Sequence, residues 1–176
     1  EAAEGFMRLM FGRRFGDIIA TAFTQPDHDL SYQNVTFAER DNVIVGMTLA
    51  YTAEQHRRSS RQPLERAAGR LRLRMRILLI LFAPLMRLND SIAEGDFYLH
   101  AIAVDKVIRV DGVGSVLMDS FEEQARASGS TRLSLDVSTK NEVARRFYER
   151  RGWKVESEWP KLWFIPSLLV RMTKPL

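Results

Sequence analysis

A glycine-containing loop at residues 109–114 lies where a predicted strand meets a predicted helix, a place where backbone groups often bind anions. The aromatic and β-branched segment 97–104 predicts a strand in the middle of a sheet. A helical pattern begins at Ser115, and Gly129 is placed to end it. Glycines let the backbone turn, so that successive N–H groups and the positive end of the helix can surround a phosphate. The loop is therefore a candidate anion-binding site, although two glycines before a helix by themselves also suit an ordinary connecting loop.

A second group of polar residues lies on the helical pattern at residues 141–151. Asn141 and Tyr148 are seven positions apart, so on a helix their directions differ by about 20° and they face the same way. The spacing of Tyr148 is typical of a core aromatic, although a phenol with a pKa of about 10 can also donate a proton. Asn141 stands where the helix begins and is predicted to be its N-cap, with ligand binding as a second role.

These residues need a sheet and helices to position them, and the alternation of apolar and polar residues predicts both. Asp41 and Asn42 suit a tight hairpin turn between the first two strands, and Gly46 suits a bulge. Helical spacing over residues 4–23 predicts one helix or two short ones. The order of strands and helices predicts an α/β fold with a mixed sheet. Strands are predicted at residues 32–39, 43–52, 97–104, 131–138, 153–159 and 167–174.

A long insert over about residues 54–93 precedes the strand at 97–104. Pro63 suits the first turn of a helix and Pro84 should kink or end it, so one helix is predicted from Pro63 to Ala83. This helix could pack on the protein's own sheet, on a second subunit, or on a lipid surface or anionic partner. Its apolar residues recur at intervals of four and three positions and form a stripe of Leu64, Ala68, Leu71, Met75, Leu78, Phe82 and Leu85.

The composition excludes several kinds of site. The chain has no cysteine, so it can form no disulfide, no thiolate zinc site and no cysteine nucleophile. Its three histidines, His28, His56 and His100, are scattered, and no metal site is predicted. Nine arginines and three acidic residues between Glu54 and Ala93 account for the net charge of +4, because the rest of the chain has 17 basic and 19 acidic residues. No nucleic-acid-binding surface is therefore predicted.

No segment of the sequence predicts a membrane span or a secretory signal. The longest apolar run, Ile77 to Met86, has ten residues, whereas a helix needs about 20 to cross a bilayer. We therefore expect a cytoplasmic protein. The chain begins at Glu1 rather than Met, within a helical pattern, so we also expect residues that precede it. The 176 residues are predicted to form a single domain, 1–176.

Two segments resemble the sequence signatures of one protein family. Arg109-x-x-Gly112-x-Gly114 is similar to the R/Q-x-x-G-x-G/A signature of the GNAT superfamily of acetyl-CoA-dependent N-acetyltransferases. Downstream, residues 135–153 resemble that family's L-x-V…N…A…FYE-x-x-GF segment, and the order agrees over about residues 96–158. The resemblance implies a GNAT-like fold. Such a fold has a mixed, mostly antiparallel central sheet flanked by helices, here with a long helical insert before the central strand.

The resemblance also implies a set of binding residues. The central strand would separate from its neighbour, and the pantetheine of acetyl-CoA would pair with backbone groups of Ile102, Ala103 and Val104. Asp111 departs from the family pattern, in which a basic or neutral polar residue is usual, and its carboxylate should weaken diphosphate binding. The other predicted cofactor-binding residues, most of them around the diphosphate, are Arg109, Val110, Gly112, Val113, Gly114, Ser115 and Asn141.

Two catalytic roles follow from the same resemblance. Tyr148 matches the family's general-acid tyrosine, which would protonate the departing CoA thiolate. Asp136 stands five residues before Asn141, where ribosomal-protein N-terminal acetyltransferases of this superfamily carry a glutamate that acts as a base. As an aspartate, it is either a base that works through a water or a solvated or ion-paired surface carboxylate.

The activity that the resemblance implies is direct transfer of an acetyl group from acetyl-CoA, as co-substrate, to a primary amine of a small molecule or peptide, without a metal. The alternative, to which Asp111 points, is a CoA-binding regulatory or interaction module without catalysis. A homodimer would follow if the insert packs on a second copy. The resemblance also places the insert towards the acceptor entrance, where Arg66, Arg70 and Arg74 would favour an acceptor or partner with negative charge.

Overall fold

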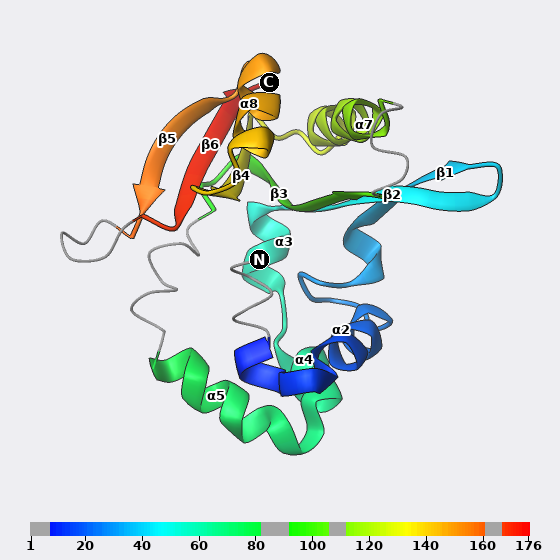
Figure 1. Ribbon diagram of the computed structural model, residues 1–176, viewed down its shortest axis with the longest axis vertical. Helices are drawn as coiled ribbons and strands as arrows, with labels where there is room; N and C mark the ends of the chain where they lie inside the picture. The colour runs from blue at the N-terminus through cyan, green and yellow to red at the C-terminus, as the bar shows by residue number, and fades with distance from the viewer. Residues whose placement is uncertain (1–7, 82–91, 106–111, 161–166) are drawn as a thin grey trace.

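The computed structural model describes residues 8–81, 92–105, 112–160 and 167–176, and its strands form one six-stranded sheet in the order β1-β2-β3-β4-β6-β5. Of the neighbouring pairs in this sheet, β3 and β4 run parallel and the others run antiparallel. The predicted fold, a mostly antiparallel mixed sheet flanked by helices, is confirmed (Figure 1). The strands are β1 (Val35–Arg40), β2 (Val43–Thr52), β3 (Asp96–Val104), β4 (Arg132–Ser138), β5 (Lys154–Trp159) and β6 (Leu169–Pro175).

The β1–β2 hairpin has the turn and the irregularity that the sequence predicts. Asp41 and Asn42 both have positive φ angles, +51° and +62°, which a two-residue hairpin turn of this kind requires. Next to Gly46, the register shifts so that Val45 has no partner on β1, which forms a bulge. The first strand is shorter than predicted, because residues Tyr32–Asn34 form a turn of 3-10 helix before it.

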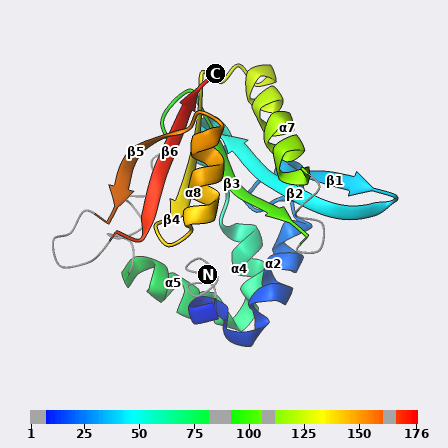
Figure 2. The ribbon, with the colours of Figure 1, turned by 45° about the horizontal axis from the view of Figure 1, so that its top comes forward.

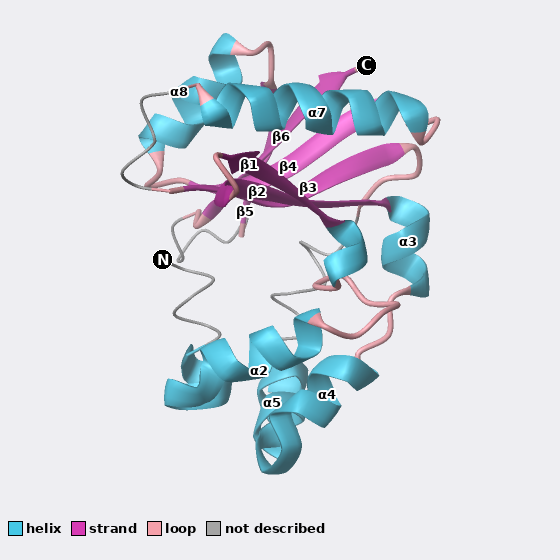
Figure 3. Cartoon of the chain, turned by 90° about the vertical axis from the view of Figure 1, so that its right-hand side faces the viewer, coloured by secondary structure: helices cyan, strands magenta, loops and turns pink. Residues whose placement is uncertain are grey.

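One face of the sheet packs against α7 (Val113–Ala127) and α8 (Glu142–Arg150), which lie side by side above it in Figure 3. Alternate residues of the strands point into this layer, as a strand period of two requires. The core that results excludes water almost completely, and it fixes both helices relative to the sheet. Its members include Phe97, Leu99, Met118, Phe121, Ala125, Leu133, Leu135, Tyr148, Trp153, Val170 and Met172.

Gly46 allows the beginning of α7 to approach the sheet closely. A Cβ atom at this position would lie 2.9 Å from the carbonyl oxygen of Ala103 and 3.0 Å from Cδ1 of Leu117. The first of these neighbours is backbone and cannot move aside without displacing β3. The glycine therefore sets how near the start of α7 comes to β2 and β3.

The opposite face of the sheet carries a second, all-helical layer (Figure 3). Thr52 begins α3 (Ala53–Arg58) with a capping box, in which its hydroxyl accepts from the amide of Gln55 and the Gln55 side chain accepts from the Thr52 amide. Within the described ranges, no helix has the length and apolarity needed to cross a membrane. The members of the layer are α2 (Phe15–Phe23), α3 (Ala53–Arg58), α4 (Gln62–Ala68) and α5 (Arg72–Leu81), with short 3-10 turns at Gly12–Arg14 and Gly69–Leu71.

The prediction of one continuous helix from Pro63 is wrong. Gly69 adopts a positive φ of +54°, which ends α4, and the chain restarts as α5 after a 3-10 turn. Packing of the stripe on the sheet is also wrong for its described members, because they pack on the N-terminal helical segment of the same chain around Phe11 and Ile18. Stripe residues beyond Leu81 lie outside the described residues. The described members in this cluster are Leu64, Ala68, Leu71, Met75 and Leu78.

Candidate active site

The parallel pairing of β3 with β4 stops halfway along β3. Residues Asp96–Leu99 pair with Arg132–Leu135, whereas β3 continues to Val104 beside β2 alone among the described residues. Figure 2 shows β3 and β4 diverging from this point. Alternate residues of a strand direct their N–H and C=O groups to opposite edges. Among the described residues, the edge of β3 that faces β4 thus has no strand partner beyond Leu99, and the predicted pantetheine-binding residues Ile102, Ala103 and Val104 belong to this segment.

A bulge marks the residue at which the strands part. Leu49 and Ala50 of β2 pair with Ala101 and Leu99, so His100 is an extra residue on β3 without a partner on β2. Such a bulge twists the strand and redirects the side chain. His100, two positions after Tyr98, lies on the face of the sheet away from α7 and α8, where its side chain contacts Tyr51 and Tyr98.

The N-terminus of α7 lies beside this unpaired edge. Gly112 is its N-cap in the left-handed conformation, with a φ of +74° and no side-chain cap. The amides of Val113 and Gly114 have no backbone acceptor among the described residues. These donors and the dipole of a 15-residue helix favour an anion, as the sequence predicts. The predicted residues Arg109, Val110 and Asp111 lie outside the described residues.

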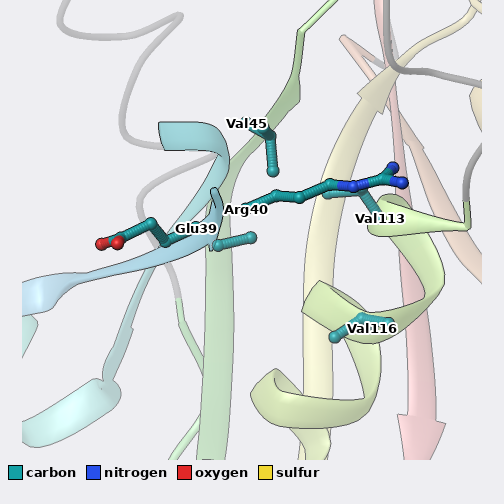
Figure 4. A pocket seen from close by; sticks show the side chains of 6 residues that line it. Glu39, Arg40, Val45, Val113 and Val116 are labelled. Atoms are coloured by element: carbon teal, nitrogen blue, oxygen red, sulfur yellow. The ribbon is translucent and has the colours of Figure 1, made fainter. Parts of the chain in front are cut away.

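A pocket of about 530 Å³ opens between this helix start and the β1–β2 hairpin. Figure 4 shows the side chain of Arg40 extending across it towards Val113, the first residue of α7. A guanidinium there adds positive charge beside the free amides of the helix. No local pattern predicts this role, because Arg40, the last residue of β1, stands 73 positions before Val113 and only the fold brings the two together.

The two predicted residues of α8 have different surroundings. Asn141 is the N-cap, as predicted, and its Oδ1 accepts a hydrogen bond from the amide of Ala144 at 3.2 Å. Tyr148 is buried in the core layer, with its ring 5.9 Å from that of Trp153. Burial raises the pKa of Tyr148 to about 12, so the phenol stays protonated well beyond neutral pH. Tyr148 is therefore both a core aromatic and a protonated hydroxyl on the α7–α8 side of the sheet.

An aromatic and histidine cluster lies on the other side of the sheet. Tyr51 Oη and His100 Nδ1 are 2.9 Å apart, and the rings of Tyr51 and Tyr98 are 5.7 Å apart. His56 stacks on Tyr51 with an interplanar angle of 9°, and its Nδ1 lies 3.0 Å from a carboxylate oxygen of Asp29. Residues from β2, β3 and α3 thus converge beside the point where β3 leaves β4.

The imidazole of His100 is reached by water yet surrounded by protein atoms. This partial desolvation lowers its pKa below the ordinary value of 6.5, and the negative charge of Asp29 offsets part of the effect. The ring is consequently neutral at physiological pH and able to accept a proton. When it does so, both ring nitrogens donate, and the phenol oxygen of Tyr51 can accept from Nδ1.

Asp136, the predicted base, is held in a buried ion pair. Arg171 Nε donates to Oδ1 at 2.9 Å, and Arg171 Nη2 donates to Oδ2 at 2.7 Å. Tyr98 Oη donates to Oδ2 at 3.0 Å. Both carboxylate oxygens therefore already accept hydrogen bonds, and Asp136 orients Tyr98 beside His100.

A candidate proton donor and a candidate proton acceptor lie on opposite faces of the sheet. A protonated phenol, Tyr148, belongs to the layer that contains α7 and its anion-binding end. A neutral imidazole, His100, belongs to the opposite face. The part of β3 that has no partner beyond Leu99 among the described residues belongs to the sheet that separates these two layers.

Comparisons with known proteins identify the family and the fold of the chain. Residues 6–153 match the model of the acetyltransferase (GNAT) family. No curated protein gives a match. One solved acetyltransferase is 24% identical, with a TM-score of 0.68 over 99% of this chain and 89% of its own. An N-acetyltransferase from Staphylococcus aureus Mu50 is 16% identical, with a TM-score of 0.65 over 98% of this chain and 90% of its own.

A third solved structure contains a ligand. It is an acetyltransferase from Bacillus anthracis str. Ames in complex with acetyl coenzyme A, 15% identical, with a TM-score of 0.54 over 81% of this chain and 61% of its own. At such identities the likeness concerns the fold alone.

Proposed function

Because the chain belongs to the GNAT acetyltransferase family, we propose that it transfers the acetyl group of acetyl-CoA directly to a primary amine. The observation that carries the proposal is the early end of the β3–β4 pairing at Leu99 and Leu135. It leaves a strand edge with no partner among the described residues, between a helix N-terminus that favours anions and two side chains suited to proton transfer. This combination matches the needs of acyl transfer to an amine, which are a bound thioester, a neutral nucleophile and a proton for the leaving thiolate.

The described residues fit acetyl-CoA. Amides of the pantetheine arm would pair with Ile102, Ala103 and Val104 as an added strand. The diphosphate would lie at the amides of residues 112–115, with Arg40 nearby. A Cβ atom at Gly112 would meet no atom of the described residues within 4 Å. Bound in this way, the cofactor supplies the acetyl group and a thiolate that must leave.

We assign the proton steps to Tyr148 and His100. Tyr148 keeps its proton at working pH because burial raises its pKa to about 12, so it can donate to the departing thiolate. His100 is neutral and can take the proton that the amine loses on attack, directly or through a water. Asp136 is the weaker candidate for this step, since accepting a proton would disrupt its pairing with Arg171 and Tyr98.

The proposal is tested by the binding of CoA and by the turnover of acetyl-CoA. A concentration of CoA about 100 times its Kd should stabilise the protein by about 2.7 kcal/mol, which raises Tm by about 5–10 °C. Acetyl-CoA offered with a panel of primary amines should release free thiol. An unchanged Tm would contradict the proposal at its first step. A raised Tm without thiol release from any amine would instead identify a CoA-binding module without catalysis.

The pH dependence of turnover tests the role of His100. Because desolvation lowers its pKa, kcat should fall only below pH 6.5, as the ring becomes protonated and can no longer accept the amine proton. His100→Gln should lower kcat about tenfold to a hundredfold at neutral pH and remove this acid limb. His56→Gln, which leaves the Tyr51–His100 contact in place, should retain the limb. An acid limb that persists in His100→Gln would assign the step to another group.

A further inference from the structure

The α5 helix has a second apolar face that the fold leaves in water. Met75, Leu78 and Leu79 point inward and pack against the N-terminal helical segment. On the outer side, large aliphatic side chains retain between 55% and 75% of their exposure. Figure 1 shows α5 at the end of the molecule away from α7 and α8. The residues of this exposed α5 face are Leu73, Ile77, Ile80 and Leu81.

Arginines border the exposed α5 face on both sides. At 100° per residue, its four members fall within an arc of about 100°, opposite the buried Met75. Arg72 and Arg76 follow on one border and Arg74 on the other, and all three are exposed. An aliphatic face with cations along both borders is typical of helices that lie in a membrane interface, because the aliphatic groups enter the acyl region while the guanidiniums reach the phosphates.

A recess beside this face would suit a phosphate group. It measures about 280 Å³ and is lined by Gln62, Glu65, Arg66, Arg72 and Arg76. Its one carboxylate, Glu65, is paired with Arg76. No carboxylate among the described residues forms an ion pair with Arg66 or Arg72, so the recess carries an excess of positive charge. Forked guanidiniums bind phosphate oxygens in pairs, which makes this a place for an anionic headgroup next to aliphatic side chains.

Charge argues against a second copy of this chain as the occupant of the face. The α5 helix contains five apolar residues besides Met75 and Leu78 and no acidic residue. Two copies packed through it would bring Arg72, Arg74 and Arg76 of each against those of the other. Like charges at such a contact cost free energy, whereas an anionic surface gains from all of them. A convex row of aliphatic side chains also needs a partner that deforms around it, which a lipid layer does.

We infer that the exposed α5 face and its arginines bind the surface of a membrane that contains anionic lipids. The helix lies in the interface plane, because its ten residues are about half the number needed to cross a bilayer. The contact is reversible, since four aliphatic side chains and a few arginines provide limited affinity. It does not depend on the proposed acetyltransferase activity.

Flotation with lipid vesicles tests this inference on the full chain. The protein should float with vesicles of phosphatidylcholine and phosphatidylglycerol, should stay in solution with phosphatidylcholine alone, and should be released by added salt. Ile77→Gln/Ile80→Gln should weaken binding at least about tenfold, since both side chains lose their burial in lipid. Arg72→Gln/Arg74→Gln should weaken it about thirtyfold, at about fivefold for each arginine.

Matched control variants distinguish membrane binding through the exposed α5 face from nonspecific adsorption to vesicles. Val43→Gln/Ile44→Gln removes two aliphatic side chains of similar exposure from the β1–β2 hairpin and should leave vesicle binding unchanged. All substituted side chains are exposed, and an unchanged Tm for each variant checks that it folds. Failure of the wild-type protein to float with anionic vesicles would overturn the inference.

Two further outcomes would also overturn it. Equal binding by the Ile77→Gln/Ile80→Gln variant would mean that the apolar face takes no part. Sedimentation without lipid that shows a dimer for the wild type and a monomer for this variant would mean that a second copy covers the face instead.

Discussion

Tyr148→Phe is expected to lower kcat for thiol release about 10²–10⁴-fold while leaving the Kd for CoA nearly unchanged. The substitution removes one hydroxyl and keeps the ring that packs against Trp153 and Phe147. Backbone groups of β3 and α7 would still hold the cofactor. The thiolate would then leave without a proton donor, which slows the chemical step and spares binding.

The pKa of Tyr148 sharpens this expectation. A phenol with a pKa of about 12 is protonated at every pH below about 10, so it cannot cause a fall in kcat between neutral pH and that value. Titration calorimetry gives the Kd, and a thiol reagent gives kcat. Phe147→Leu on the same helix changes packing without removing a hydroxyl, and it should reduce Tm more than kcat. A Tyr148→Phe enzyme with wild-type kcat would exclude Tyr148 as the acid.

Arg132→Leu is expected to lower the free energy of unfolding by about 3–5 kcal/mol. Arg132 Nε and Nη2 donate to the two carboxylate oxygens of Asp96 at 2.6 and 3.1 Å. Asp96 retains only 1% of its exposure, so removing the arginine leaves a buried carboxylate without its counter-charge. Urea denaturation followed by fluorescence of the three tryptophans measures the loss.

A surface ion pair provides the matched control. Arg146 and Glu142 pair at 3.0 Å on α8, with both side chains 70% exposed. Arg146→Leu should therefore cost only about 0.3–0.5 kcal/mol. Adding Asp96→Asn to Arg132→Leu should recover part of the larger loss, because it removes the buried charge. Equal losses for Arg132→Leu and Arg146→Leu would show that the burial of Asp96 has little weight.

The sequence predicted the elements whose signals are local. The alternation of Leu133, Leu135 and Val137 placed β4 correctly, and Asp41 and Asn42 identified the hairpin turn. The structure of the insert was the main feature that the sequence predicted wrongly. Its stripe continues in register through Gly69, and a periodic pattern does not reveal that a glycine has left the helical conformation. The spacing of the apolar residues also does not predict which element they pack against, and in the structure it is the N-terminal helical segment.

The candidate site was predictable only where a family signature covers it. Asn141, Tyr148 and the glycines of the α7 cap lie within such a signature, and they stand at a helix cap, on the core face and at a helix N-terminus. The Tyr51–His100 pair spans 49 positions and depends on the pairing of β2 with β3, which no local pattern marks. The pairing of Arg171 with Asp136 likewise depends on the insertion of β6 between β4 and β5.

The short β3–β4 ladder also divides the sheet mechanically. Strands β1, β2 and β3 join β4, β6 and β5 through four residue pairs, Asp96–Leu99 with Arg132–Leu135. Arg132 and Asp96 are the first residue pair of this seam, so their ion pair holds β3 and β4 together at the end where the strands are paired. Rotation of the two half-sheets about this seam would widen or narrow the gap between β3 and β4, beside which His100 lies. The pairing of the other neighbouring strands would stay intact. Amide hydrogens of β3 beyond Leu99 should consequently exchange earlier than those of the buried seam, and a ligand that pairs with this part of β3 should slow their exchange.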